Sequence, residues 1–187
     1  YGKALRWTLE KQFSTIALGQ TITRNHLLNE GVETFQNRSA ASTDILHEYF
    51  VPVEQLEPFL ERLRFIIPSH RAELLNVTIR FLTTDQDSFL RYANQDMFAL
   101  VMLFNQPRTQ PGEQKMAAMT RELIDAVLEV GGRYYLPYRL HATVEQFHRC
   151  YPQAEQFFAL KRQYDTEGLF QNELYQKYST REYLSSS

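Results

Sequence analysis

Hydrophobic and polar positions along the chain follow two periods, one of two residues and one of three to four residues. The segment 45–51 is rich in β-branched and aromatic side chains and precedes Pro52, which predicts a strand that ends there. Strict alternation over 77–82 predicts a second strand. The continuously apolar segment 97–104 predicts a third, fully buried and covered on both faces, and the aromatic segment 133–138 predicts a fourth.

Segments of helical spacing lie between these strands. Apolar residues recur at three- and four-residue intervals over 53–67, where Pro68 closes the helix, and over 116–130, where Gly131 and Gly132 follow at the C-cap. The order strand, helix, strand, strand, helix, strand is that of a ferredoxin-like unit. The sequence therefore predicts an α+β fold, βαββαβ, with helices on one face of an antiparallel sheet and the other face free.

Additional helices are predicted at both ends of this unit. The first sixteen residues have helical spacing and a polar stretch follows, so 1–44 is interpreted as a helix and a connection. The segment 45–178 is expected to form one domain, and 179–187 to form a loose tail. The chain starts at Tyr1 and not at methionine, so a fragment of a longer protein is expected.

Two helices are predicted after the fourth strand. The first covers 143–151 with Thr143 as its N-cap, and the second covers 153–164 and stops before Gly168. Its aromatic residues are expected to face inward; they are Phe157, Phe158 and Tyr164.

Composition and charge argue against several classes of protein. With 187 residues, 43% of them hydrophobic, the chain is long enough to bury a sizeable core. A formal charge of −2 and a pI near 6.2 argue against nucleic acid as a partner. The longest apolar run, 97–104, is far shorter than the roughly 20 residues that cross a bilayer, so no membrane span is expected.

The cysteine, histidines and glycines of the sequence restrict which kinds of covalent link and binding site the chain can form. The single cysteine, Cys150, excludes an internal disulfide and suits a reducing compartment such as the cytoplasm. The five histidines have no paired metal-ligand spacing, so no metal site is expected. Glycine-rich phosphate loops are absent from the sequence, so any dinucleotide must be bound mainly by another domain.

The second predicted strand carries a charged residue at its centre. Arg80 lies on the face opposite Val77, Ile79 and Phe81, and a guanidinium there needs an anion or a water-filled cleft. An active site would provide such a cleft. The alternative is that Arg80 reaches the edge of the sheet and pairs with a surface carboxylate.

Several sequence segments resemble a known family. EYFVP at 48–52 resembles the start of its substrate domain, and TIR at 78–80 matches a Glu-x-Arg pattern. RYYLPY at 133–138 lies where relatives carry His-Trp-x-Lys, and KRQYDTEGLFQN at 161–172 resembles Lys-x-x-x-Asp-Pro-x-Gly-x-Phe-x-Asn. The chain thus resembles the FAD-linked oxidases of the vanillyl-alcohol oxidase type over about 45–178, with aldonolactone, alditol and decaprenylphosphoryl-ribose oxidases as nearest relatives.

The resemblance implies catalytic roles for Arg80, Tyr135 and Tyr138. Tyr135 takes the place of the family's histidine and Tyr138 that of its lysine. A tyrosine can donate a hydrogen bond, or act as a base if Arg80 lowers its pKa, but it cannot supply a fixed positive charge. The alternative is that the tyrosines of 133–138 are amphipathic packing residues.

The resemblance also implies binding residues. Glu48 and Thr78 are expected to contact the substrate, although Thr78 replaces a glutamate and so cannot bind a polyol as a charged acceptor. Arg133 and Asn172 are expected to contact FAD, which a separate domain of the same natural protein would hold. The implied function is the substrate-binding part of an oxidoreductase that transfers a hydride from an alcohol-type, sugar- or polyol-like substrate to the flavin.

A different class of function remains open from the residues alone. A ferredoxin-like sheet can also form a stand-alone module that binds a small ligand or has a regulatory role, without catalysis. An RNA-binding sheet would carry exposed aromatic and basic residues on its central strand, and 97–104 has no charge, which disfavours RNA. If the oxidase interpretation holds, the fragment alone is expected to be inactive because its flavin domain is missing.

Overall fold

The computed structural model describes residues 39–179, and all of them belong to one compact unit, Asn37–Ser187. The predicted N-terminal helix and nearly all of the predicted tail lie outside the described residues. The described elements, in chain order, are β1 Ser42–Pro52, the short 3-10 helix η2 Val53–Gln55, α3 Leu56–Ser69, β2 Glu73–Leu82, β3 Met97–Pro107, α4 Gln110–Glu129, β4 Arg133–Tyr134, α5 Val144–Cys150, α6 Ala154–Tyr164 and α7 Glu173–Tyr178.

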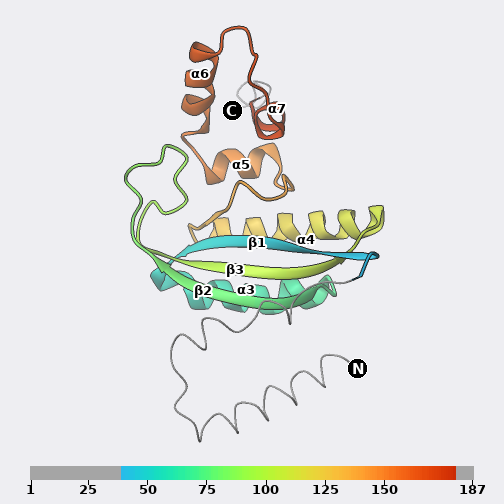
Figure 1. The fold of residues 1–187 in the computed structure, drawn as a ribbon. Coiled ribbons are helices and arrows are strands. Elements are labelled where there is room, and N and C mark those ends of the chain that lie inside the picture. Colours follow the sequence, from blue (N-terminus) through green and yellow to red (C-terminus); the bar gives the residue numbers. More distant parts are fainter. Residues whose placement is uncertain (1–38, 180–187) are drawn as a thin grey trace, which may run out of the picture. The chain divides into compact units, whose positions relative to one another are not determined.

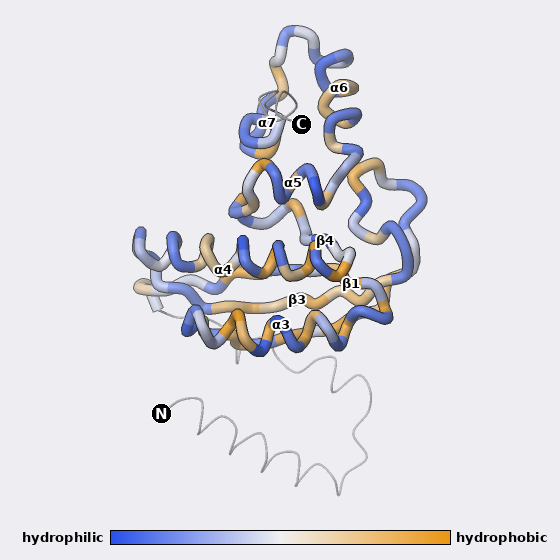
Figure 2. The backbone as a smooth tube through the Cα atoms, turned by 180° about the vertical axis from the view of Figure 1, so that it is seen from behind, coloured by the Kyte–Doolittle hydropathy of each residue, from blue (hydrophilic) through white to orange (hydrophobic). Residues whose placement is uncertain are grey.

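The four strands form one antiparallel sheet in the order β2-β3-β1-β4. Helices α3 and α4 both lie on one side of this sheet (Figures 1 and 2). The predicted ferredoxin-like α+β fold is therefore confirmed. Within 39–179, no helix is both long enough and apolar enough to pass through a membrane.

The hydrophobic core lies between the sheet and the two helices. From the sheet, Tyr49 and Leu100 enter the core, and α3 and α4 contribute Phe59 and Leu123, each fully buried. Full burial of such a side chain stabilises the fold by roughly 1.5–3 kcal/mol. Because successive strand residues point to opposite faces, the even-numbered residues of β1 and the odd-numbered residues of β3 face away from the helices.

The end of α4 follows the predicted glycine signal. Gly131 has a φ of +72°, and the backbone N–H groups of Gly131 and Gly132 donate to carbonyl oxygens in the last turn of the helix. A Cβ atom on Gly132 would lie 2.4 Å from the carbonyl oxygen of Phe50 and 2.6 Å from Cγ2 of Val127. Only glycine therefore lets β4 start directly against β1.

Two strand predictions need correction. Strand β4 ends at Tyr134 and not at residue 138, because the chain leaves β1 after Tyr135 N–H donates to Glu48 O at 3.0 Å. Strand β3 is central, but Val101 and Leu103 are only partly buried. The helices cover one face of β3, whereas the loop 83–96 covers only one end of the other face.

The C-terminal helices lie where the sequence predicts them, but not every side chain on them points in the predicted direction. Thr143 and Gln146 form a capping box at the start of α5, as the pattern predicts. On α6, Phe158 is fully buried, but Phe157 is 36% exposed and Tyr164 is 86% exposed. A helix at the periphery of the domain buries only one side. The prediction that Phe157, Phe158 and Tyr164 all face inward was therefore wrong. Helix α7 had no sequence prediction.

Candidate active site

The face of the sheet that the helices do not cover carries polar side chains on β1 and β2, on either side of β3. Glu48 on β1 lies opposite Val101 on β3, which lies opposite Thr78 on β2. The next row contains Arg80, opposite Ala99. Strand pairing therefore brings Glu48 of β1 onto the same surface as Thr78 and Arg80 of β2.

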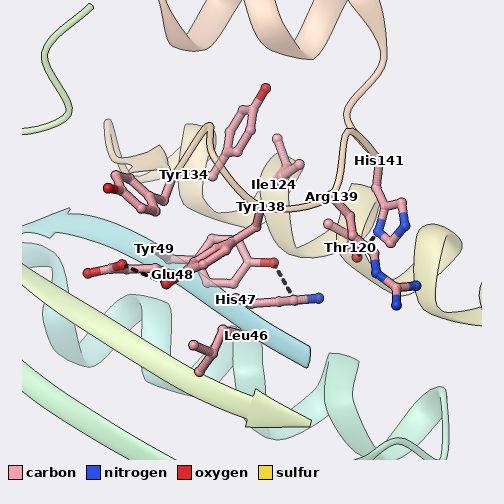
Figure 3. A pocket seen from close by; sticks show the side chains of 11 residues that line it. Leu46, His47, Glu48, Tyr49, Thr120, Ile124, Tyr134, Tyr138, Arg139 and His141 are labelled. Atoms are coloured by element: carbon pink, nitrogen blue, oxygen red, sulfur yellow. Dashed lines mark hydrogen bonds between the residues drawn. The ribbon is translucent and has the colours of Figure 1, made fainter. Parts of the chain in front are cut away.

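Two tyrosines from the chain after β4 lie beside Glu48. The Tyr135 backbone N–H holds this segment to β1, and the rings of Tyr135 and Tyr138 meet edge to face with centroids 5.2 Å apart. The Tyr138 hydroxyl donates to Oε2 of Glu48 at 3.5 Å, a long and weak contact (Figure 3). Arg80, Tyr135, Tyr138, Glu48 and Thr78 thus share one face, and we call these five residues the face cluster.

The electrostatics of the face cluster set its protonation. Burial raises the pKa of Glu48, and the charge of Arg80 and the hydrogen bond from Tyr138 offset this only in part. Burial and the neighbouring Glu48 raise the pKa of Tyr138, and Arg80 offsets that rise in part. Tyr138 therefore stays protonated at neutral pH and is a donor, which excludes the lowered-pKa base considered from the sequence.

Arg133 does not join the face cluster through its charged group. Its guanidinium donates to the carbonyl oxygen of Arg91 in the loop 83–96 and lies 5.5 Å from the ring centroid of Tyr151. In the same loop, Tyr92 stacks on Phe50 with centroids 4.4 Å apart. These contacts hold the loop 83–96 over one end of the sheet face that the helices do not cover.

Asn172 also lies apart from the face cluster. It is the N-cap of α7, where its Oδ1 accepts a hydrogen bond of 2.8 Å from the backbone N–H of Tyr175. Asn172 lines a surface hollow formed mainly by aromatic and apolar residues of α6, α7 and the turn between them, including Phe157 and Phe170. Within the described residues, Asn172 acts as the N-cap of α7.

A polar network that the sequence did not reveal lies next to the face cluster. Glu113 at the start of α4 accepts hydrogen bonds from Gln106 Nε2 at 2.7 Å, from His141 Nε2 at 2.7 Å and from Arg139. Thr120 Oγ1 lies 3.0 Å from Nδ1 of His141. These five residues form the Glu113 network. No local pattern could have found it, because it joins β3, α4 and the segment after β4.

The Glu113 network and a neighbouring histidine have strongly shifted pKa values. Burial alone would raise the pKa of Glu113, but hydrogen bonds from Gln106 and His141 and the charge of Arg139 lower it to about 2. Burial, followed by the nearby His141 and Arg139, lowers the pKa of His47 to about 3. His47 is therefore neutral at physiological pH, with Nδ1 lying 3.1 Å from the Tyr49 hydroxyl.

A small hollow separates the face cluster from the Glu113 network. Its cavity volume is only about 20 Å³, and it is partly open to solvent. Figure 3 shows Glu48 and Tyr138 on one side of the hollow and Arg139 and His141 on the other. Within 39–179, no group of three His, Cys, Asp or Glu side chains is placed to hold a metal ion.

The fold and this geometry agree with a comparison to known families. The family described as D-arabinono-1,4-lactone oxidase matches residues 4–178. The chain belongs to this family. It corresponds to the C-terminal part of FAD-linked oxidases of the aldonolactone-oxidase type, so the resemblance in the sequence is confirmed. A search of curated proteins gives no match.

Membership of an FAD-dependent oxidase family implies FAD, a small-molecule substrate and an FAD-binding domain as partner. The hydrogen-bond donors on the uncovered face of the sheet are chemically suited to contact a flavin or a substrate. Arg80 is exposed and offers a positive charge, and the Tyr138 hydroxyl is a protonated donor. Both suit the electron-rich oxygen atoms of a flavin or of a substrate held against it.

Proposed function

We propose that this chain is the substrate-binding part of an FAD-dependent oxidoreductase that removes a hydride from the carbinol C–H of an alcohol-type, sugar- or polyol-like substrate. The observation that carries the proposal is the convergence of Glu48, Arg80 and Tyr138 on the uncovered face of the sheet. Family membership supports the oxidase class. A flavin held by the FAD-binding domain would supply the hydride acceptor, and oxygen or another acceptor would reoxidise it.

The residues of the face cluster would bind and orient the substrate. Arg80 and the Tyr138 hydroxyl donate hydrogen bonds to the substrate oxygen, and Tyr135 holds the Tyr138 ring by edge-to-face packing. The substrate O–H proton passes to the carboxylate of Glu48, whose raised pKa makes it a better proton acceptor than an exposed glutamate. Thr78 contributes a neutral hydroxyl at the far side of the row.

Arg133 and Asn172 would contact the flavin domain or the flavin. Arg133 supplies a positive charge at the end of the free face, and Asn172 uses only its amide oxygen for the helix cap, so its amide nitrogen would make the contact. Both roles rest on the resemblance. Their positions outside the face cluster fit a cofactor contact better than a substrate contact.

The proposal is tested in the full-length flavoprotein by anaerobic flavin reduction. Arg80→Gln and Tyr138→Phe are each expected to slow reduction at saturating alcohol by at least about tenfold, because one lost catalytic donor costs on the order of 10²-fold in well-studied sites. Arg64→Gln, an exposed arginine on α3, is the control. Unchanged rates would remove Arg80 and Tyr138 from the mechanism.

Glu48→Gln tests the proton acceptor separately. The reduction rate of the unchanged enzyme is expected to rise with pH through the ionisation of Glu48, and the variant is expected to lose this dependence. A full-length protein purified without bound flavin would instead favour the alternative, a non-catalytic small-ligand module.

A further inference from the structure

The Tyr138 hydroxyl is not held in place by its own hydrogen bond. Its contact with Oε2 of Glu48 is 3.5 Å long, which is too long to fix the direction of a phenol group. The ring of Tyr138 is held instead by its edge-to-face contact with the ring of Tyr135, whose centroid lies 5.2 Å away. The residues that position Tyr135 therefore also position the hydroxyl that the proposed function needs.

Two other aromatic rings hold the ring of Tyr135. Phe50 on β1 and Tyr92 in the loop 83–96 both meet it edge to face, with centroids at 6.0 and 5.7 Å and interplanar angles of 75° and 82°. Tyr92 also stacks on Phe50, with centroids 4.4 Å apart, and Phe50 is fully buried. The position of Tyr135 thus depends on a loop residue that lies far from it in the sequence.

The loop that carries Tyr92 is held by contacts that do not use the Tyr92 ring. At its base, the backbone N–H and the hydroxyl of Thr84 both donate to Oδ1 of Asp96, at 2.9 and 3.1 Å. At its tip, the carbonyl oxygen of Phe89 accepts a hydrogen bond of 2.9 Å from Nε2 of Gln153. We therefore expect the loop to keep its place when Tyr92 loses its ring.

We propose that Tyr92 is a positioning residue for the oxidation. Acting through Tyr135, its ring holds the hydroxyl of Tyr138 next to the carboxylate of Glu48. This inference rests on the proposed function. Without the Tyr92 ring, Tyr135 packs on Phe50 alone from that side, and the Tyr138 ring can turn away from the carboxylate. A misplacement of about 1 Å can cost on the order of 10²-fold in rate, so the loss falls on the rate of the reaction and not on substrate binding.

The first test measures anaerobic flavin reduction in the full-length flavoprotein, with sorbitol and D-arabinono-1,4-lactone as probes. Tyr92→Ala is expected to lower the limiting rate at saturating probe by at least about fivefold, and to change the half-saturating concentration by less than about twofold. Tyr92→Phe keeps the ring and is expected to keep the rate, because the Tyr92 hydroxyl has no hydrogen-bond partner within 39–179. An unchanged rate in Tyr92→Ala, or equal losses in both variants, would overturn the inference.

Phe89→Ala is the matched control from the same loop. The ring of Phe89 packs on Phe157 of α6 with centroids 6.3 Å apart, and among the described residues it makes no ring contact with Tyr135. This variant is expected to keep the limiting rate within about twofold of the unchanged protein. A loss as large as that of Tyr92→Ala would assign the effect to the whole loop and overturn the specific role of Tyr92.

A double substitution tests whether Tyr92 acts through Tyr138. In Tyr138→Phe the donor is already absent, so adding Tyr92→Ala is expected to slow flavin reduction no further. Independent losses that multiply would show that the Tyr92 ring acts on something other than the Tyr138 hydroxyl, and would refute the inference. If Tyr92→Ala does not fold, Tyr92→Leu, which keeps an apolar side chain against Phe50, is measured in the same way.

Failure of this inference and failure of the proposed function give different results. If Tyr138→Phe slows reduction but Tyr92→Ala does not, the oxidase function stands and the role of Tyr92 falls. If neither probe reduces the flavin of the unchanged protein, or if Tyr138→Phe leaves the rate unchanged, the function proposed for the face cluster fails. The role of Tyr92 then fails with it.

Discussion

The face cluster and the Glu113 network are neighbouring groups of polar side chains, but they satisfy their hydrogen-bonding capacity in opposite ways. In the Glu113 network, one carboxylate accepts hydrogen bonds from three residues at normal or short distances, and its pKa falls to about 2. In the face cluster, Glu48 accepts one side-chain hydrogen bond from the described residues, of 3.5 Å, and its pKa is raised.

This difference separates a structural group from a candidate functional group. A carboxylate that accepts several hydrogen bonds within the protein stabilises the fold and has little capacity left for a ligand. Glu48 keeps unused acceptor capacity on a surface that the other residues of 39–179 leave open. The comparison therefore predicts that substitutions in the Glu113 network reduce stability, whereas substitutions in the face cluster reduce activity alone.

The largest expected effect concerns His47, which lies beside the Glu113 network. Its pKa in the folded chain, about 3, is lower than its ordinary value of 6.5, so the unfolded state binds more protons between these two pH values. Stability is fully present above pH 6.5 and is lost as pH falls towards 3, by on the order of 4 kcal/mol.

Urea unfolding of the chain at pH 7 and at pH 4 measures this loss. In His47→Gln, which cannot take up a proton, the difference between the two pH values is expected to shrink. Equal differences in the two proteins would show that His47 is not the group responsible. His141 and Glu113 contribute in the same direction, with Glu113 acting between about pH 4.5 and 2.

Glu113→Gln is expected to lower the free energy of unfolding at pH 7 by about 1–2 kcal/mol. The variant removes charge-assisted hydrogen bonds to Arg139 and His141 but keeps the size of the side chain, and the partial exposure of Glu113 limits the loss. A double-mutant cycle with Arg139→Met isolates the interaction energy between Glu113 and Arg139. A coupling energy near zero would show that the network is not a structural unit.

Asn172 can be assigned to capping or to cofactor contact by two substitutions. Asn172→Ala is expected to destabilise the chain by about 1 kcal/mol, and Asn172→Ser by much less, because serine also caps helices. If Asn172 touches the flavin, both variants change the flavin spectrum or the reduction rate of the full-length protein. If only Ala has an effect, capping is its whole role.

The smallest stability effect is expected in the face cluster. Glu48→Gln and Tyr138→Phe should each change the free energy of unfolding by no more than about 0.5 kcal/mol, since they break only one long hydrogen bond. Thermal and urea unfolding of the chain would measure this. A loss of 2 kcal/mol in either variant would place Glu48 or Tyr138 among the structural groups and remove the contrast with Glu113.

Much of the fold was predictable because its signals are local. Pro52 ends β1, Gly131 and Gly132 end α4, and the Thr143–Gln146 capping box starts α5, each through hydrogen bonds or steric limits within a few residues. The exposure of Phe157 and Tyr164 was not predictable, because helical spacing defines a face but not which neighbours cover it.

The sequence by itself determined the order of strands and helices, the caps, and the residue types available for chemistry, because these depend on contacts between near neighbours in the chain. Only the tertiary structure decided which of these residues meet. Strand pairing brought Glu48, Thr78 and Arg80 onto one face, and the early departure of β4 brought Tyr138 to Glu48. The tertiary structure also brought Glu113 into contact with His141 and left Val101 and Leu103 partly exposed. Burial and long-range hydrogen bonds depend on which surfaces pack together.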